Sequence, residues 1–362
     1  MATVLFTGFP GFLGVELLPR VLARREGTTA VCIVQAKFMD LARRRSDELA
    51  RSRPETAGRI RLMEGDITRP DLGLAAPTEL AGETVEIFHL AAVYDLSVRR
   101  DFAMKVNVDG TRNVLDFAAR CSRLERLQYI STCYVSGRHP GTFLEDDLEK
   151  GQVFNNFYEE TKYLAEREVR ARMKAGLPAT IYRPAIAVGD SITGATQKYD
   201  GPYFFIQWLL RNPLPVAIMP VVGDLTAEVN VVPRDFVVSA IAHLAGMPAA
   251  KGKTYQLADP APLRVSELLD AVGQATGRRL IKIPLSVGLA KWSIDHVPGV
   301  YQLMRIPSSS IDYFVHPTHY DTRNTVADLR GSGISCPPFT AYLDRLVAFV
   351  KSHPEIGSAA MT

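Results

Sequence analysis

Short apolar runs alternate along the first half of the chain with longer segments in which apolar residues recur every three or four positions. Runs rich in β-branched residues predict buried strands, and a period near 3.6 predicts the helices that cover them. This alternation is typical of a parallel α/β sheet with helices on both faces and ligands at the carboxyl ends of its strands. We expect strands at residues 4–6, 30–34, 60–64, 85–90, 127–131 and 179–183.

After about residue 190 the pattern changes, because prolines, glycines and aromatic residues become frequent and the regular stretches become shorter. The shift predicts a nucleotide-binding domain at residues 1–190 and mainly a substrate-binding lobe at residues 191–362. Residues 229–245 read as one more strand and helix, which we expect to return to the first domain. Prolines and Arg211 interrupt the apolar stretch 204–222, so we predict no membrane span.

Composition excludes several classes of protein. The chain has 362 residues, 47% of them hydrophobic, and a net charge of +3 with both signs scattered along it. Such a balance argues against nucleic acid as a partner. The four cysteines lie far apart and lack the paired spacing of metal or redox sites. We therefore expect no metal, reduced thiols, no signal peptide and a cytoplasmic location.

The first predicted strand runs directly into a turn in which glycine recurs every third residue, ahead of a helical pattern. Glycines let the backbone turn tightly and approach a pyrophosphate, whose charge the amides of a helix N-terminus can meet. The position after the first strand favours a dinucleotide site over an ordinary turn. The sequence thus predicts a Rossmann-type doubly wound sheet with cofactor contacts at Gly8, Phe9, Pro10, Gly11, Phe12, Leu13 and Gly14.

The cofactor preference is predicted by the end of the second strand. An acidic residue about 20 positions after the glycine turn ordinarily accepts the adenosine ribose hydroxyls and favours NAD. Residues 34–37 contain no carboxylate and include Gln35 and Lys37. Because Lys37 can bind an additional phosphate as a point charge, we expect a preference for NADP(H), with NAD(H) as the alternative.

The candidate catalytic groups lie at residues 131–162. Tyr158 and Lys162 are four residues apart, hence neighbours on one helix face, so the lysine charge can stabilise a tyrosinate. Ser131 and Thr132 end the fifth predicted strand, where a hydroxyl can bind a substrate carbonyl. Successive residues of a strand point to opposite sides, so only one of the two can serve. We choose Thr132 and keep Ser131 as the alternative.

These segments resemble the extended short-chain dehydrogenase/reductases over nearly the whole chain. The resemblance rests on Thr-Gly-Phe-Pro-Gly-Phe-Leu-Gly at 7–14, His-Leu-Ala-Ala at 89–92, Asn-Val-Asp-Gly-Thr at 107–111, and Tyr158 with Lys162. It implies Thr132, where serine is commoner, as the catalytic hydroxyl, and Asn107 as a support of the active site. The further cofactor contacts that it implies are Asp66, Ile67, Ala91, Ala92, Tyr158, Lys162, Pro184 and Ile186.

Within this family the chain looks most like the thioester reductase and fatty acyl-CoA reductase (male sterility) branch. Glu-Gly-Asp-Ile-Thr at 64–68 and Tyr-Arg-Pro at 182–184 carry that likeness. The branch implies NADP(H)-dependent reduction of a carbonyl or an acyl thioester, delivered on coenzyme A or a carrier protein, to an aldehyde or alcohol. Homodimers are common in the family, so a homodimer is implied as well.

Two alternatives use the same scaffold. A sugar-nucleotide epimerase or dehydratase would employ the same three catalytic residues with a tightly bound NAD, and a non-catalytic NADP-binding sensor would keep only the fold. Lys198, Tyr199 and Tyr203 are either substrate contacts or packing residues of the lobe. We expect His89 to be structural, and His316 and His319 to pack in a loop rather than bind a metal, because Pro317 between them disfavours a helix.

Overall fold

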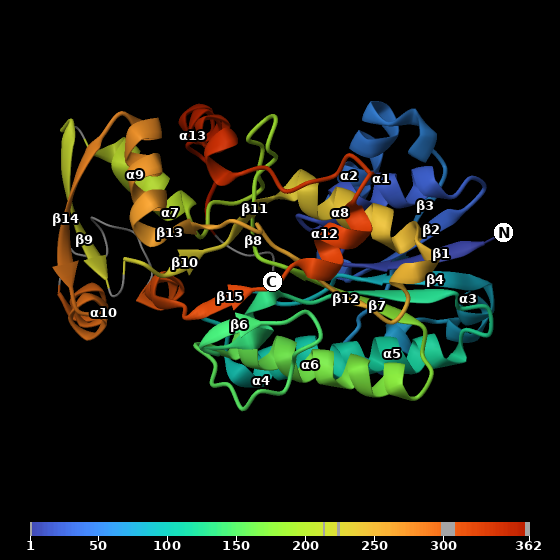
Figure 1. Cartoon of the computed structure of the whole chain (residues 1–362). Coiled ribbons are helices and arrows are strands. Elements are labelled where there is room, and N and C mark those ends of the chain that lie inside the picture. Colours follow the sequence, from blue (N-terminus) through green and yellow to red (C-terminus); the bar gives the residue numbers. More distant parts are fainter. Residues whose placement is uncertain (1, 213, 223–224, 298–307, 359–362) are drawn as a thin grey trace.

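The computed structural model describes residues 2–212, 214–222, 225–297 and 308–358. Its centre is a seven-stranded parallel sheet with the strand order β12-β7-β5-β4-β1-β2-β3 (Figure 1). The predicted α/β class and six of its strands are therefore confirmed. The strands of this sheet are β1 (Thr3–Thr7), β2 (Thr29–Val34), β3 (Ile60–Glu64), β4 (Thr84–His89), β5 (Arg126–Ile130), β7 (Ala179–Pro184) and β12 (Thr254–Leu257).

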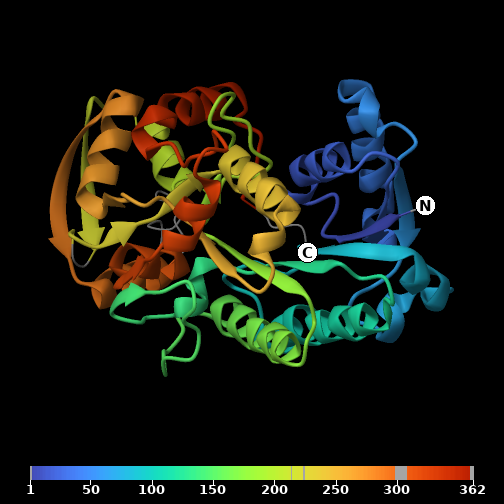
Figure 2. The ribbon, with the colours of Figure 1, turned by 45° about the vertical axis from the view of Figure 1, so that its right-hand side comes forward.

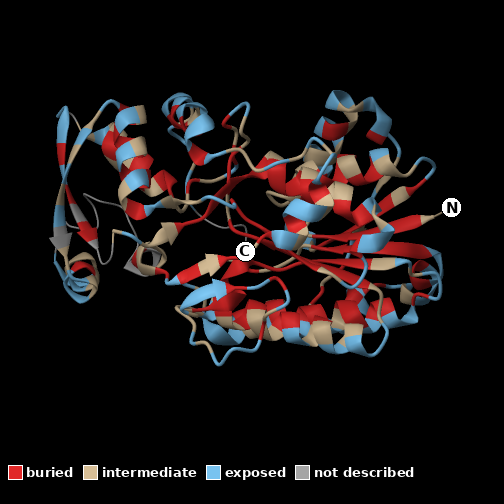
Figure 3. Ribbon diagram, viewed as in Figure 1, coloured by how far each residue is buried: buried red, intermediate tan, exposed pale blue. Residues whose placement is uncertain are grey.

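Helices cover both faces of the sheet, as expected for a doubly wound fold. Their apolar sides are buried and their outer sides exposed (Figure 3). One face carries α1 (Gly14–Arg24), α2 (Met39–Ser52), α8 (Arg234–Gly246) and α12 (Arg323–Leu329), and the other carries α3 (Pro77–Glu83), α4 (Arg100–Ala103), α5 (Gly110–Arg120) and α6 (Phe157–Lys174).

The C-terminal part builds a second core beside the carboxyl ends of the main strands (Figure 2). Three helices pack together there: α7 (Tyr203–Arg211), α9 (Val265–Thr276) and α13 (Leu343–Ser352). At the far end of this lobe, β9 (Val216–Val222) and β14 (Arg279–Leu285) form a parallel two-stranded sheet next to α10 (Val287–His296).

Segments from the second half also return to the first. In residues 229–245, α8 packs against α1, whereas β11 (Val231–Pro233) pairs with β8 (Ile186–Val188) outside the main sheet. The strand that extends the main sheet after β7 is β12. The short strands β6 (Gly141–Phe143) and β15 (Thr318–Tyr320) pair in parallel, and β10 (Glu228–Val229) pairs with β13 (Leu263–Arg264).

Short helical turns connect these elements. The segment η4 (Met104–Asp109) is π-helical and leads directly into α5. Among the described residues, no helix combines the length and the apolar character needed to cross a membrane. The 3₁₀ turns are η1 (Ala36–Phe38), η2 (Pro54–Thr56), η3 (Pro70–Gly73), η5 (Cys133–Ser136), η6 (Pro248–Ala250), η7 (Ser308–Val315) and η8 (Phe339–Ala341).

Candidate active site

A cavity of about 800 Å³ lies between the carboxyl ends of the main strands and the C-terminal lobe. Ligands bind at this edge in doubly wound sheets because the loops that follow the strands converge there. The cavity brings together nearly every predicted site residue. Those lining it are Gly8, Phe9, Gly11, Phe12, Leu13, Gly14, Lys37, Asp66, Ile67, Ala91, Ala92, Thr132, Tyr158, Lys162, Pro184 and Ile186. Pro10 and Asn107 do not line it.

The glycine turn leaves no room for side chains. Gly8 has φ of +90°, and a Cβ added there would lie 2.8 Å from the backbone nitrogen of Ala91. A Cβ on Gly11 or Gly14 would lie 2.8 or 2.6 Å from the carbonyl oxygen of Gly8. The backbone is therefore open to a ligand at the N-terminus of α1, and these residues fit the pyrophosphate of a nicotinamide dinucleotide.

The end of the cavity near β2 and β3 has the polar groups expected for an adenosine. Burial would raise the pKa of Asp66, but hydrogen bonds from Thr68 and Gln35 lower it, so this carboxylate is charged. Lys37 lines the cavity with its Nζ 4.9 Å from the ring centroid of Phe38. Gln35 also lines the cavity. The sequence had drawn attention to Gln35 only because no carboxylate stands at the end of the second strand.

Thr132 and Tyr158 meet inside the cavity. Burial raises the pKa of Tyr158 to about 12, and a hydrogen bond with the Thr132 hydroxyl counteracts part of that rise. Thr132 Oγ1 lies 3.4 Å from the carbonyl oxygen of Pro184 and accepts from the Tyr134 amide at 3.3 Å. Tyr158 is therefore protonated at neutral pH, next to a second hydroxyl, which is an arrangement able to hold and protonate a carbonyl oxygen.

Lys162 lines the same cavity, but its hydrogen bonds point toward β5 rather than toward Tyr158. Its Nζ donates to the carbonyl oxygen of Ile130 at 2.8 Å and to Tyr129 Oη at 3.2 Å. Burial lowers the pKa of Lys162 to about 7, and the charge of Glu166 opposes that shift. The direct stabilisation of a tyrosinate by Lys162 stays a prediction, because the Lys162 ammonium bonds to Ile130 and Tyr129.

Asn107 lies outside the cavity lining and bonds to two segments that contribute to that lining. Its amide group exchanges hydrogen bonds of 2.8 and 3.0 Å with the backbone of Val93 and donates to Thr161 Oγ1 at 3.0 Å. It thereby connects the loop after β4 with the helix that carries Tyr158.

His89 is buried between Thr7 and Thr111, and burial lowers its pKa to about 3, so it is a neutral structural side chain as expected.

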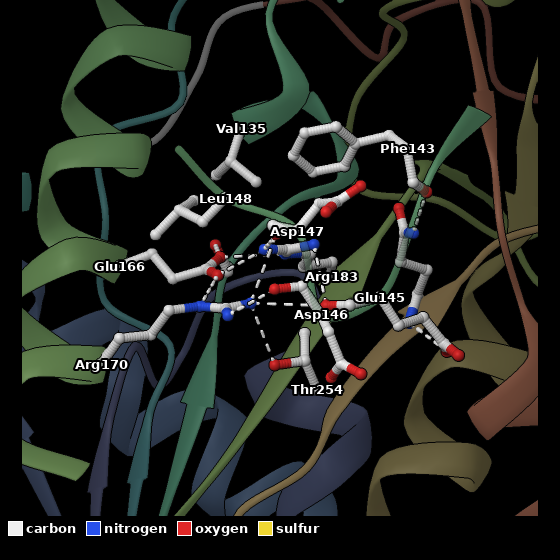
Figure 4. Close-up of polar contacts among 12 residues, drawn as sticks. Val135, Phe143, Glu145, Asp146, Asp147, Leu148, Glu166, Arg170, Arg183 and Thr254 are labelled. Carbon is white, nitrogen blue, oxygen red and sulfur yellow. Dashed lines mark hydrogen bonds and ion pairs between the residues drawn. The ribbon is translucent and has the colours of Figure 1, made fainter. Parts of the chain in front are cut away.

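Ser131, the alternative catalytic hydroxyl, is engaged elsewhere. Its Oγ donates to Glu166 Oε2 at 2.6 Å, and Glu166 is paired with the buried Arg183 (Figure 4). Neither Glu166 nor Arg183 was among the predicted site residues. An arginine in the apolar run of β7 was the available signal, since a buried guanidinium requires a partner.

The cavity lining beyond the predicted cofactor contacts combines apolar and aromatic side chains with polar ones such as Asp95, Lys105 and Gln197. Lys198 also lines the cavity, with its Nζ 4.1 Å from the ring centroid of Tyr94, and pairs with Asp200. Tyr199 and Tyr203 instead pack inside the lobe, where their hydroxyls bond to the backbone of His353 and Gly189. Phe102, Tyr134, Phe204, Val229, Leu268, Tyr313 and Phe314 form the apolar part of the wall.

His316 lies in the loop before β15, as expected, whereas His319 lies within β15 rather than in a loop. His316 bonds to Tyr320 Oη at 2.8 Å, and His319 bonds to Glu228 at 2.7 Å. In the described part of the chain, no three His, Cys, Asp or Glu side chains form a group that could hold a metal ion.

Residues 6–241 match the model of one protein family, described as the male sterility protein. The chain belongs to the male sterility protein family. The match includes the glycine turn, Thr132, Tyr158 and Lys162, so it covers most of the cavity described above.

Relatives of this chain include the isonitrile lipopeptide synthase from Streptomyces coeruleorubidus, which is 28% identical over 368 aligned positions. The match covers 92% of this chain but only 23% of that synthase, so the chain spans a minor part of its relative's length. Among solved structures, the terminal R domain from the myxalamid PKS-NRPS biosynthetic pathway is 27% identical with a TM-score of 0.83, covering 98% of this chain and 91% of that one.

A thiolation-reductase di-domain from an archaeal non-ribosomal peptide synthetase shares the fold, with 23% identity, a TM-score of 0.75, and coverage of 98% of this chain and 76% of that one. Family and fold together identify this member of the male sterility protein family as a nicotinamide-dependent oxidoreductase of the extended short-chain dehydrogenase/reductase type.

Proposed function

We propose that this chain reduces acyl thioesters to aldehydes or alcohols, using NADP(H) as the reductant. The observation that carries the proposal is that Thr132 and Tyr158 line one cavity together with the glycine turn and a set of apolar side chains. The aromatic and aliphatic side chains of the lining, among them Phe204 and Phe314, can pack against the acyl chain of a thioester.

When bound, a reduced nicotinamide would supply the hydride that the carbonyl carbon of the substrate accepts. Thr132 and Tyr158 hold the carbonyl oxygen as it gains negative charge, and Tyr158 donates its phenolic proton to that oxygen. Its raised pKa, about 12, keeps Tyr158 in the acid form over the physiological range. Glycines 8, 11 and 14 would hold the pyrophosphate, and the lining side chains Asp66 and Ile67 would hold the adenosine.

The reaction balances with one NADPH and one proton for each aldehyde. Hydride and proton addition convert the thioester to a hemithioacetal; its carbon–sulfur bond then breaks, and the thiol leaves as the aldehyde forms. Reduction of the aldehyde to the alcohol would consume a second NADPH and a second proton. The protein supplies placement and charge, while the hydride chemistry belongs to the cofactor.

The preference for NADP(H) is proposed from Gln35 and Lys37, which line the cavity where a carboxylate would favour NAD. Lys37→Glu should lower the ratio of NADPH to NADH affinity, by roughly tenfold or more if one charged contact is lost. Fluorescence titration of both cofactors measures the ratio. Arg43→Glu, an exposed charge change on α2, is the control and should leave it unchanged. An unchanged ratio in Lys37→Glu would contradict the assignment.

We propose further that the thioester arrives on coenzyme A or on a carrier domain. The likeness to a reductase joined to a thiolation domain favours the carrier. The apolar part of the wall gives the acyl group a binding site that does not depend on which thiol carries it.

The experiment is the loss of NADPH absorbance when the purified protein meets acyl-CoA and acyl-carrier thioesters, aldehydes, ketones and nucleotide sugars. Consumption with thioesters, together with release of free thiol, is the expected result. Turnover with aldehydes alone would restrict the enzyme to the second reduction. No consumption, with NAD retained through purification, would overturn the proposal in favour of an epimerase.

A further inference from the structure

Glu166 lies at the centre of a buried charged cluster that the chemistry above does not use. The side chains of Glu166 and Arg183 are both 0% exposed. Arg183 donates to the carboxylate at 2.6 and 3.1 Å, Arg170 at 2.9 Å and Ser131 at 2.6 Å. One carboxylate therefore accepts hydrogen bonds from β7, from its own helix and from the residue that follows β5.

The two guanidinium groups are themselves held in place (Figure 4). Arg183 donates to the carbonyl oxygens of Asp147 at 2.6 Å and Glu145 at 3.3 Å. Arg170 donates to the carbonyl oxygen of Asp146 at 2.9 Å and to Thr254 Oγ1 at 3.2 Å. Because fixed backbone groups hold its partners, the carboxylate of Glu166 has one well-defined position.

Each segment that contacts Glu166 also carries a residue of the proposed active site. Ser131 immediately precedes Thr132, and Arg183 immediately precedes Pro184, whose carbonyl oxygen lies 3.4 Å from Thr132 Oγ1. On α6, Glu166 lies one helical turn after Lys162 and two turns after Tyr158, so the three share a helix face. The cluster therefore joins the strand ends to the catalytic helix.

We propose that Glu166 is a positioning residue of this active site: its carboxylate ties the ends of β5 and β7 to α6, and its negative charge favours the ammonium form of Lys162. The inference rests on the proposed function, because it assigns Glu166 to the same reaction.

The charges around Lys162 support this role. Burial would raise the pKa of Glu166, but the charge and hydrogen bonds of Arg183, with Arg170 and Ser131, lower it to about 2, so the group stays ionised. Tyr129 and His89 also face Lys162, from β5 and β4, and Tyr158 precedes Lys162 by one turn of α6. Burial raises the pKa of both tyrosines and lowers that of His89, so all three are neutral near pH 7.

The first test compares Glu166→Gln with Glu168→Gln. Glu168 lies on the same helix but is partly exposed and pairs with Arg112 at 2.7 Å, so it is a matched control. Lysines labelled with ¹³C at Cε are titrated by NMR without substrate, and the Lys162 signal is assigned by its absence from Lys162→Arg. Removing the negative charge should move the titration of Lys162 to lower pH in Glu166→Gln and leave it unchanged in Glu168→Gln.

The second test uses Ser131→Ala, which keeps the ion pair and therefore the fold if Glu166→Gln proves too unstable to purify. Loss of the tether should lower kcat for the thioester by roughly ten- to a hundredfold with a smaller change in KM, because a displaced Thr132 fails mainly in the transition state. Ser131→Thr, which retains the hydroxyl, should recover most of the rate. The Lys162 titration should stay as in the wild type.

A double-mutant cycle separates positioning from a direct role of Ser131. If Ser131 acts through Glu166, the double variant should be no slower than Glu166→Gln alone, whereas independent roles would give multiplied losses. Multiplied losses, or wild-type kcat in Ser131→Ala, would overturn the positioning role, and an unmoved Lys162 titration in Glu166→Gln would overturn the electrostatic one. Wild-type protein that does not reduce thioesters would instead contradict the proposed function. The Lys162 titration would still decide whether the charge of Glu166 favours the ammonium form of Lys162.

Discussion

The parallel strands at the two ends of the molecule differ in how completely their side chains are buried. Every residue of β7 is buried, and even its arginine is paired inside the protein. In the two-stranded sheet of the C-terminal lobe only one face is buried: Met219 is 1% exposed, whereas its neighbour Ile218 is 61% exposed. Ile218 is in register with Ile281 of β14, which is 49% exposed, so the apolar outer face spans both strands.

The difference shows where the fold determines position most strictly. At the end of β7, charged groups taken out of water must meet partners at fixed distances, so hydrogen bonds from several elements locate each atom. The outer sheet of the lobe is held by non-directional apolar contacts on one side only, which tolerate small displacements. The residues that we assign to catalysis all belong to the first kind of environment.

The largest effect should follow from Tyr158→Phe. Removing the phenolic hydroxyl removes the proton donor, so thioester turnover should fall by about 10²–10⁴-fold while NADPH affinity is retained. Tyr199→Phe is the matched control, because it deletes a buried hydroxyl that bonds to His353 in the lobe, away from the cavity lining. Stopped assays at saturating NADPH and fluorescence titration give both quantities. Full activity in Tyr158→Phe would refute its catalytic role.

Arg183→Met should have the next largest effect, on stability. The change leaves Glu166 buried and partly unpaired, which costs about 3–5 kcal/mol of unfolding free energy. Arg99→Met breaks an ion pair whose side chains are 84% and 66% exposed, and should lower the stability far less than Arg183→Met does. Urea unfolding of the two variants measures the contrast. Equal costs would mean that the buried cluster contributes no more than a surface pair.

Much of the fold could be predicted because its signals are local. The strand bounds, the glycine turn after β1, and the positions of Thr132 and Tyr158 in one cavity all follow from patterns within a few residues of each other. Such patterns suffice where a parallel sheet brings successive strand ends to one edge. Strand alternation showed only that one of Ser131 and Thr132 can face the cavity, and the family resemblance supplied the choice of Thr132.

The parts that could not be predicted depend on contacts between distant segments. The strand β12 pairs with β7, although 69 residues lie between the end of β7 and the start of β12. Nothing in the four residues of β12 indicates that β7 is the partner. Lys162 was expected beside Tyr158, but its ammonium bonds to Ile130 and Tyr129, whose positions depend on the packing of α6 against β5. Helix spacing specifies a face and not the direction of a side-chain end.

The smallest effect should be that of Ile218→Ala, on the exposed face of the two-stranded sheet in the lobe. Met219→Ala removes a buried side chain and should cost about 2–5 kcal/mol of unfolding free energy. Ile218→Ala, one residue away, should cost less than about 1 kcal/mol, because at 61% exposure little beyond strand propensity is lost. Urea unfolding at several protein concentrations measures both. If Ile218→Ala were as costly as Met219→Ala, and its cost grew with protein concentration, the outer face would be covered in solution and the contrast between the two ends would not hold for the assembled protein.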